Sequence, residues 1–115
     1  MRVLLVDDEP SFRAYVRATV AEALSDAEIV GEASDGTEAV ALAKELRPDV
    51  VFIDFGMPRM DGVTATLHIK SALPDIQVVM LSGTDRSDEA ADIAEVKLVR
   101  KDAVNANTIR AALGQ

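Results

Sequence analysis

Short apolar runs alternate with longer stretches of helical periodicity along the whole chain. Each run has the length of a strand, and the five runs are Val3–Val6, Glu28–Ala33, Val50–Ile53, Ile76–Leu81 and Lys97–Val99. Strands that alternate with helices predict βαβ units with right-handed crossovers, and therefore a parallel sheet covered by helices on both faces. The near-continuous apolar character of the runs agrees with this, because central parallel strands are buried on both sides.

The stretches between the runs carry the apolar spacing of helices. Phe12, Val16 and Val20 follow one another at four-residue steps, which places them on one helix face. We expect helices over Ser11–Leu24, Thr37–Leu46, Asp61–Leu73 and Val104–Leu113, and a short fifth helix over Asp85–Ala94. The predicted fold class is α/β, with a doubly wound five-stranded parallel sheet and about five helices in three layers.

Length, charge and cysteine content narrow the functional classes. A chain of 115 residues that is 49% hydrophobic fits one compact domain, residues 1–115, and leaves no room for an output domain. Without cysteine, neither disulfides nor thiolate metal sites can form. A net charge of −8 disfavours direct binding to nucleic acid or anionic lipid. No apolar run approaches the roughly 20 residues of a membrane span, and no targeting segment is recognisable, so we expect a cytoplasmic protein without membrane contact.

Polar residues follow the apolar runs where parallel strands would end together. Asp7 and Asp8 follow the first run, Asp54 the third and Ser82 the fourth, while Arg100-Lys101 follows the fifth. In open α/β sheets, ligands bind in the crevice beyond the carboxyl ends of the strands. Adjacent carboxylates repel each other and cost stability unless a cation or hydrogen-bond donors compensate. The sequence therefore predicts a cation-requiring acidic site at this edge of the sheet.

Four segments, in order and over essentially the whole chain, read VLLVDDEPSFR, PDVVFIDFGMPRMDG, VVMLSG and VRKDA. Together they resemble the receiver domain of two-component response regulators. An acid pair, a lone strand-end Asp followed by M-P-x-M-D-G, a strand-end hydroxyl and a late Lys form a specific combination, although each part alone is weak. Receivers are a standard example of the flavodoxin-like strand order 2-1-3-4-5, so the resemblance supplies that order. The KDA segment is similar to receivers attached to helix-turn-helix DNA-binding output domains.

The resemblance implies a phosphoacceptor and a metal site. Asp54 corresponds to the residue that accepts a phosphoryl group from a phosphohistidine, so the expected partner is a sensor histidine kinase or a phosphotransfer protein. Mg²⁺ is the expected cofactor. Its implied ligands are Asp8, Asp54 and the backbone carbonyl of Gly56, with Asp7 acting through water, because this hard ion prefers oxygen ligands and retains waters.

Two further residues complete the implied site. Lys101 matches the cation that pairs with Asp54 before transfer and with phosphate after it. Ser82 matches the hydroxyl that turns toward a phosphoryl oxygen. The chain would then be a self-phosphorylating and autodephosphorylating switch rather than a turnover enzyme. Its state would be read by a DNA-binding output domain or partner if the chain is a fragment, and a homodimer is also compatible with the sequence.

Several of these residues also have ordinary structural explanations. Asp8 could cap the first helix, and we expect Asp61 to be a helix cap or a turn residue rather than a ligand. Only one of Arg100 and Lys101 can face the acids, since neighbours on a strand point to opposite sides. The residues alone leave that choice open, and the resemblance favours Lys101. We expect His68, the sole histidine, at the surface.

Two features depart from the receiver pattern. The interval from Ser82 to Lys101 is a few residues short, and Leu98 stands where receivers commonly carry an aromatic residue that reports phosphorylation. We therefore expect readout by backbone displacement of Gly83–Val96. The alternative function is a phosphorylation-independent, receiver-like protein-interaction module whose acids are relics or stability features. A nucleotide-binding domain is disfavoured, because the chain lacks a Gly-rich phosphate loop.

Overall fold

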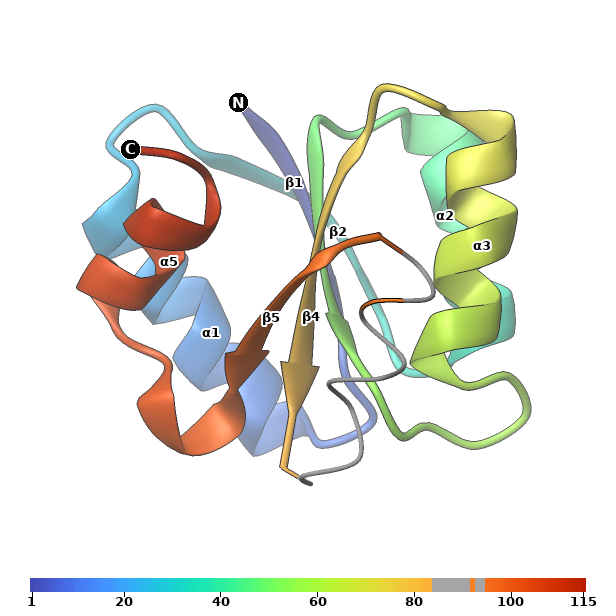
Figure 1. The fold of residues 1–115 in the computed structure, drawn as a ribbon, viewed down its shortest axis with the longest axis horizontal. Helices are drawn as coiled ribbons and strands as arrows, with labels where there is room; N and C mark the ends of the chain where they lie inside the picture. Colours follow the sequence, from blue (N-terminus) through green and yellow to red (C-terminus); the bar gives the residue numbers. More distant parts are fainter. Residues whose placement is uncertain (84–91, 93–94) are drawn as a thin grey trace.

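The sheet contains five parallel strands in a single layer (Figure 1). The computed structural model describes residues 1–83, 92 and 95–115. The strands are β1 (Arg2–Val6), β2 (Glu28–Ala33), β3 (Val50–Asp54), β4 (Gln77–Ser82) and β5 (Lys97–Arg100). Their order is β2-β1-β3-β4-β5 and every neighbouring pair is parallel, which confirms the doubly wound, flavodoxin-like prediction. Asp54 and Ser82 are the last residues of their strands, whereas the apolar runs alone placed both just beyond the strand ends.

Helices cover both faces of the sheet. They are α1 (Pro10–Ala23), α2 (Gly36–Leu46), α3 (Gly62–Ala72) and α5 (Ala106–Ala112), with a 3-10 turn, η1, over Lys101–Ala103. Figure 1 shows α1 and α5 together on one side and α2 and α3 together on the other, which gives the three predicted layers. These four helices begin and end within two residues of their predicted bounds. The predicted fifth helix, Asp85–Ala94, lies outside the described residues except for Asp92.

Alternate side chains of the central strands enter two separate cores. Leu5 and Phe52 pack with Val20 on the α1/α5 side, whereas Leu4 and Ile53 belong to the core beneath α2 and α3. Because side chains alternate across a strand, one buried strand supplies both cores. All five residues of β3 are buried, so Asp54 is attached to a rigid central element.

Side-chain caps fix the starts of α2, α3 and α5, but not the start of α1. The Asp61 carboxylate accepts the Thr64 N–H at 2.8 Å, which confirms the predicted cap. The N-cap of α1 is Glu9, and no side chain caps this helix, so the capping explanation for Asp8 is wrong.

His68 is exposed on α3, as predicted. None of the helices in the described part of the chain combines the length and apolarity that a membrane span requires.

Candidate functional site

The ends of four adjacent strands, β1, β3, β4 and β5, bring the predicted site residues to one edge. Asp7 directly follows β1, and Asp54 ends β3, the strand beside it in the sheet. Ser82 ends β4, which pairs with β3, and Lys101 begins η1 immediately after β5. The parallel register therefore gathers residues that are up to 94 positions apart in the sequence.

The Lys101 ammonium lies between two buried carboxylates. Its Nζ is 3.0 Å from Asp7 Oδ2 and 3.4 Å from Asp54 Oδ1. The same nitrogen lies 3.9 Å from Glu9 Oε1 and 4.6 Å from the centroid of the Phe12 ring, a cation–π contact. Arg100 instead forms an ion pair with Asp102 at 3.6 Å, between two exposed side chains. Of the two adjacent cations, Lys101 is the one that faces the acids.

An open hollow of about 320 Å³ lies over these groups. We call it the acidic pocket, and it is lined by Asp8, Glu9, Asp54, Phe55, Gly56, Ser82, Gly83 and Lys101. Of these residues, Asp54 and Ser82 are almost fully buried and Asp8 is exposed. Asp7 is buried against Lys101. A ligand that enters this pocket therefore meets a carboxylate, a hydroxyl and an ammonium group together.

The Asp7 carboxylate is only partly satisfied by the protein. Its Oδ1 accepts the Glu9 N–H at 2.8 Å, which fixes the orientation of the carboxylate. Its Oδ2 is buried and accepts no well-aligned hydrogen bond; its close partner is the Lys101 ion pair. Carboxylate oxygens of Asp7, Asp8 and Glu9 lie within 4.8 Å of one another. An oriented buried oxygen beside an exposed carboxylate fits a hard cation that keeps part of its water shell.

Burial and charge shift the pKa values of the central pair. Burial raises the pKa of Asp54 to about 7, and the Asp7 carboxylate adds to the rise while Lys101 opposes it. Burial lowers the pKa of Lys101, but its contacts with Asp7 and Asp54 outweigh this and leave that pKa above its ordinary value. The ammonium therefore stays charged at neutral pH, whereas ionised Asp54 needs more positive charge than Lys101 supplies.

This raised pKa predicts how the stability of the metal-free fold depends on pH. Between the ordinary value of 3.8 and about 7, folded Asp54 binds more protons than unfolded Asp54, so its contribution to stability falls as pH rises. Asp54→Asn lacks this titration. We expect the unfolding free energy of Asp54→Asn, relative to wild type, to increase from pH 4 to pH 8 in urea titrations with EDTA. A difference that stays constant or decreases would contradict the raised pKa.

Arg13 is a site residue that sequence reasoning missed. Its Nη1 donates to the Asp7 carbonyl at 2.7 Å, and its Nε donates to Glu32 Oε1 at 2.8 Å. Arg17 also binds Glu32, and these contacts hold the pKa of Glu32 below its usual range. Arg13 thereby links the backbone of the acid pair to β2. The sequence feature that could have identified Arg13 is its position in the first turn of the helix that follows Asp7 and Asp8.

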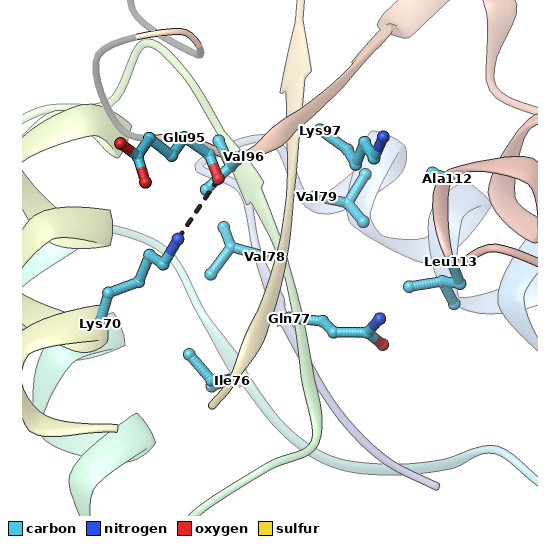
Figure 2. Close-up of a pocket in the computed structure, with 10 residues that line it drawn as sticks. All are labelled: Lys70, Ile76, Gln77, Val78, Val79, Glu95, Val96, Lys97, Ala112 and Leu113. Atoms are coloured by element: carbon cyan, nitrogen blue, oxygen red, sulfur yellow. Dashed lines mark hydrogen bonds between the residues drawn. The ribbon is translucent and has the colours of Figure 1, made fainter. Parts of the chain in front are cut away.

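A second hollow, of about 410 Å³, lies at the opposite ends of the strands (Figure 2). Gln77 and Lys97, the first residues of β4 and β5, help to line it, and Lys70 Nζ donates to the Glu95 carbonyl at 3.3 Å. Because ligands in doubly wound folds bind beyond the carboxyl ends of strands, and the predicted site residues lie there, the acidic pocket is the stronger candidate site.

Comparisons with known proteins match most of the chain. A family model for the response regulator receiver domain matches residues 3–111. The chain is 41% identical over 118 residues to the transcriptional regulatory protein LiaR of Bacillus subtilis, covering 97% of this chain and 56% of LiaR. It is 45% identical over 82 residues to the response regulator protein VraR of Staphylococcus aureus, covering 71% of this chain and 39% of VraR.

The fold of this chain is also similar to that of a solved receiver structure. The REC domain of AraT, a response regulator from Geobacillus stearothermophilus, has a TM-score of 0.86 and 31% identity, covering 98% of this chain and 89% of that one. The chain spans 56% or less of the length of LiaR and VraR. Since the family model covers residues 3–111 and the fold matches that of a receiver domain, the chain belongs to the response regulator receiver domain family.

Proposed function

We propose that this domain is a phosphorylation-activated signalling switch. Asp54 accepts the phosphoryl group, and the donor is a phosphohistidine on a sensor histidine kinase or phosphotransfer protein. The observation that carries the proposal is the position of Lys101 Nζ between the Asp7 and Asp54 carboxylates, next to an open pocket. The similarity to LiaR and VraR, which are named as regulatory proteins, supports a signalling role.

The proposed reaction is a direct transfer between two nucleophiles. An Asp54 carboxylate oxygen attacks phosphorus, a P–O bond forms, and the P–N bond breaks with its electron pair leaving on the donor imidazole. Lys101 stabilises the negative charge on the transferred group, and the Ser82 hydroxyl donates to one of its oxygens. Phosphoryl transfer needs mainly positioning and charge stabilisation, which a side chain on the buried strand β3 and a fixed ammonium provide.

We assign Mg²⁺ to the acidic pocket. Asp8, Asp54 and the Gly56 carbonyl would hold it, with Asp7 acting through water, and all of these donors are the oxygens that the ion prefers. The buried Asp7 Oδ2 without an aligned donor and the raised pKa of Asp54 both favour added positive charge. When bound, the ion neutralises the carboxylates and the phosphoryl oxygens.

The phosphorylated form is the signal in this proposal. Water slowly hydrolyses the acyl phosphate, so the domain resets itself and is a switch rather than a turnover enzyme. A DNA-binding output domain or a separate partner would read its state. Leu98 is half-buried in β5, and the segment expected to move, Gly83–Val96, lies mostly outside the described residues. An interaction module that works without phosphorylation is the outcome if no phosphoryl group is accepted.

Mg²⁺ is expected to stabilise the folded chain through Asp8. At about 100 times its Kd, a ligand that binds only the folded state adds about 2.7 kcal/mol to the unfolding free energy. Asp8→Ala should lose most of this gain. Without metal, the same variant should be at least as stable as wild type, because one of the adjacent like charges is removed. Urea unfolding with and without Mg²⁺ measures both effects.

The matched control for this test is Asp75→Ala, which removes an exposed acid at the other end of the strands. Its response to Mg²⁺ should equal that of wild type. Full Mg²⁺ protection of Asp8→Ala, or no protection of wild type, would refute the assigned metal site.

A further inference from the structure

One ion pair ties the loop between β3 and α3 to the start of α2. Arg59 Nε donates to Asp35 Oδ2 at 3.0 Å, and Arg59 Nη2 binds the same oxygen. The other oxygen of Asp35 accepts the Glu38 N–H at 2.8 Å and caps α2. Asp35 is buried although the Arg59 side chain is 65% exposed. Within residues 1–83, 92 and 95–115, no other ion pair joins this loop to another element.

The loop backbone is unfavourable where this ion pair holds it. Arg59 has a φ of +67°, in the left-handed region that residues with a Cβ rarely adopt. Such conformations persist when the surrounding structure enforces them. The Glu38 N–H and the Arg59 guanidinium also hold the pKa of Asp35 below its usual value, so this partner stays charged. The ion pair is therefore a contact that can maintain the strained turn.

Backbone packing fixes both ends of the loop and leaves its middle dependent on α2. At the start, the Phe55 N–H donates to the Leu81 carbonyl at 2.8 Å. At the end of the loop, a Cβ on residue 62 would lie 2.2 Å from the Asp54 carbonyl oxygen. The backbone can come this close to β3 only because residue 62 is a glycine. A Cβ on Gly36 would likewise lie 2.2 Å from the Met60 carbonyl oxygen. The middle of the loop thus rests directly on the start of α2.

Gly56 lies between the anchored Phe55 and the part of the loop that rests on α2, with open space on the side where a Cβ would stand. A Cβ built on Gly56 would meet no atom within 4 Å, so neighbouring side chains do not pack against it there. Its carbonyl is nevertheless one of the Mg²⁺ ligands in the proposed function. Because Mg²⁺ demands near-octahedral geometry, a displaced carbonyl weakens binding.

We infer that the Arg59–Asp35 ion pair is a positioning device that holds the Gly56 carbonyl in place for the metal, an inference that rests on the proposed function. The ion pair keeps the strained turn at Arg59 against the start of α2. Loss of the guanidinium leaves the unfavourable φ of residue 59 without its partner, and the loop then occupies other conformations. Only the molecules whose loop keeps the binding-competent conformation can then bind Mg²⁺, so the apparent affinity of the protein for Mg²⁺ falls.

The test compares Arg59→Ala with Arg47→Ala. Arg47 is an exposed arginine with a φ of +50° at the opposite end of α2, so the control removes the same side chain from a similar backbone conformation. If the competent fraction falls to about one fifth, Arg59→Ala raises the Kd for Mg²⁺ about fivefold, measured by calorimetric titration. Arg59→Lys should recover part of the affinity, and Arg47→Ala should bind Mg²⁺ like wild type.

A second readout needs no metal. In the metal-free protein, Arg59→Ala should shift the backbone ¹³C resonance of the Gly56 carbonyl, whereas Arg47→Ala should leave it unchanged. An unchanged resonance together with wild-type Mg²⁺ affinity in Arg59→Ala overturns the positioning role and leaves the proposed function intact. Absence of Mg²⁺ binding by the wild-type chain overturns the metal assignment, and this inference with it.

Discussion

Replacing Asp54 by Asn is expected to abolish phosphoryl uptake from acetyl phosphate in the presence of Mg²⁺. The amide has nearly the shape of the carboxylate but lacks a nucleophilic oxygen. We do not expect the variant to unfold. Burial and the Asp7 carboxylate raise the pKa of Asp54, so the charged carboxylate that the substitution removes is unfavourable in the folded state. Phosphate-affinity electrophoresis at increasing times after mixing measures the product.

The control for this prediction is Asp61→Asn. Asp61 lies in the loop that follows β3, and its side chain caps α3. It should retain phosphoryl uptake, because its carboxylate binds the Thr64 N–H rather than facing the acidic pocket. Product formation by Asp54→Asn at the wild-type rate would assign the reaction to another residue.

Replacing Lys101 by Met is expected to destabilise the metal-free fold by about 3 kcal/mol at pH 8, the usual scale for removing one partner of a buried ion pair. Met keeps an apolar stem against Phe12 but leaves the Asp7 and Asp54 carboxylates without their cation. The loss should be smaller at pH 5, because Asp54, with a pKa of about 7, is then protonated. Urea unfolding at both pH values measures the effect.

Two further variants separate this charge effect from general damage. Lys97→Met removes an exposed lysine at the other end of β5 and should change stability by no more than about 0.5 kcal/mol. Adding Asp54→Asn to Lys101→Met should restore much of the lost stability, because one of the uncompensated carboxylates is gone. A double variant as unstable as Lys101→Met would show that Asp54 is not the carboxylate that needs the cation.

The fold was predictable because it depends on periodicity. The apolar runs located all five strands, and β2 has the predicted bounds, Glu28–Ala33. Parallel strands end at a common edge, so the strand ends alone predicted that Asp7, Asp54 and one of the two cations Arg100 and Lys101 lie close together. Apolar spacing was less informative about individual side chains. Leu67 lies in an expected helix of apolar pattern, yet it is 48% exposed.

Contacts between side chains of different elements could not be predicted in this way. Arg13 reaches the Asp7 carbonyl, and Arg59 reaches Asp35 across 24 positions of sequence, because the packing of helices and loops on the sheet sets those distances. The same limit applied to the choice between Arg100 and Lys101. The 3-10 turn after β5 directs Lys101 toward the acids, and the apolar run before it carried no sign of that turn.

Intact mass of the wild-type chain, incubated with acetyl phosphate and Mg²⁺ and followed by mapping of the modified residue, tests the central claim most directly. We predict a mass increase of one phosphoryl group, located on Asp54 and absent when EDTA replaces Mg²⁺. The mixture should return to the original mass after the donor is removed, since the acyl phosphate hydrolyses. An unchanged mass with Mg²⁺ present, or a phosphoryl group on any other residue, would contradict the proposal that Asp54 is the phosphoacceptor of this receiver domain.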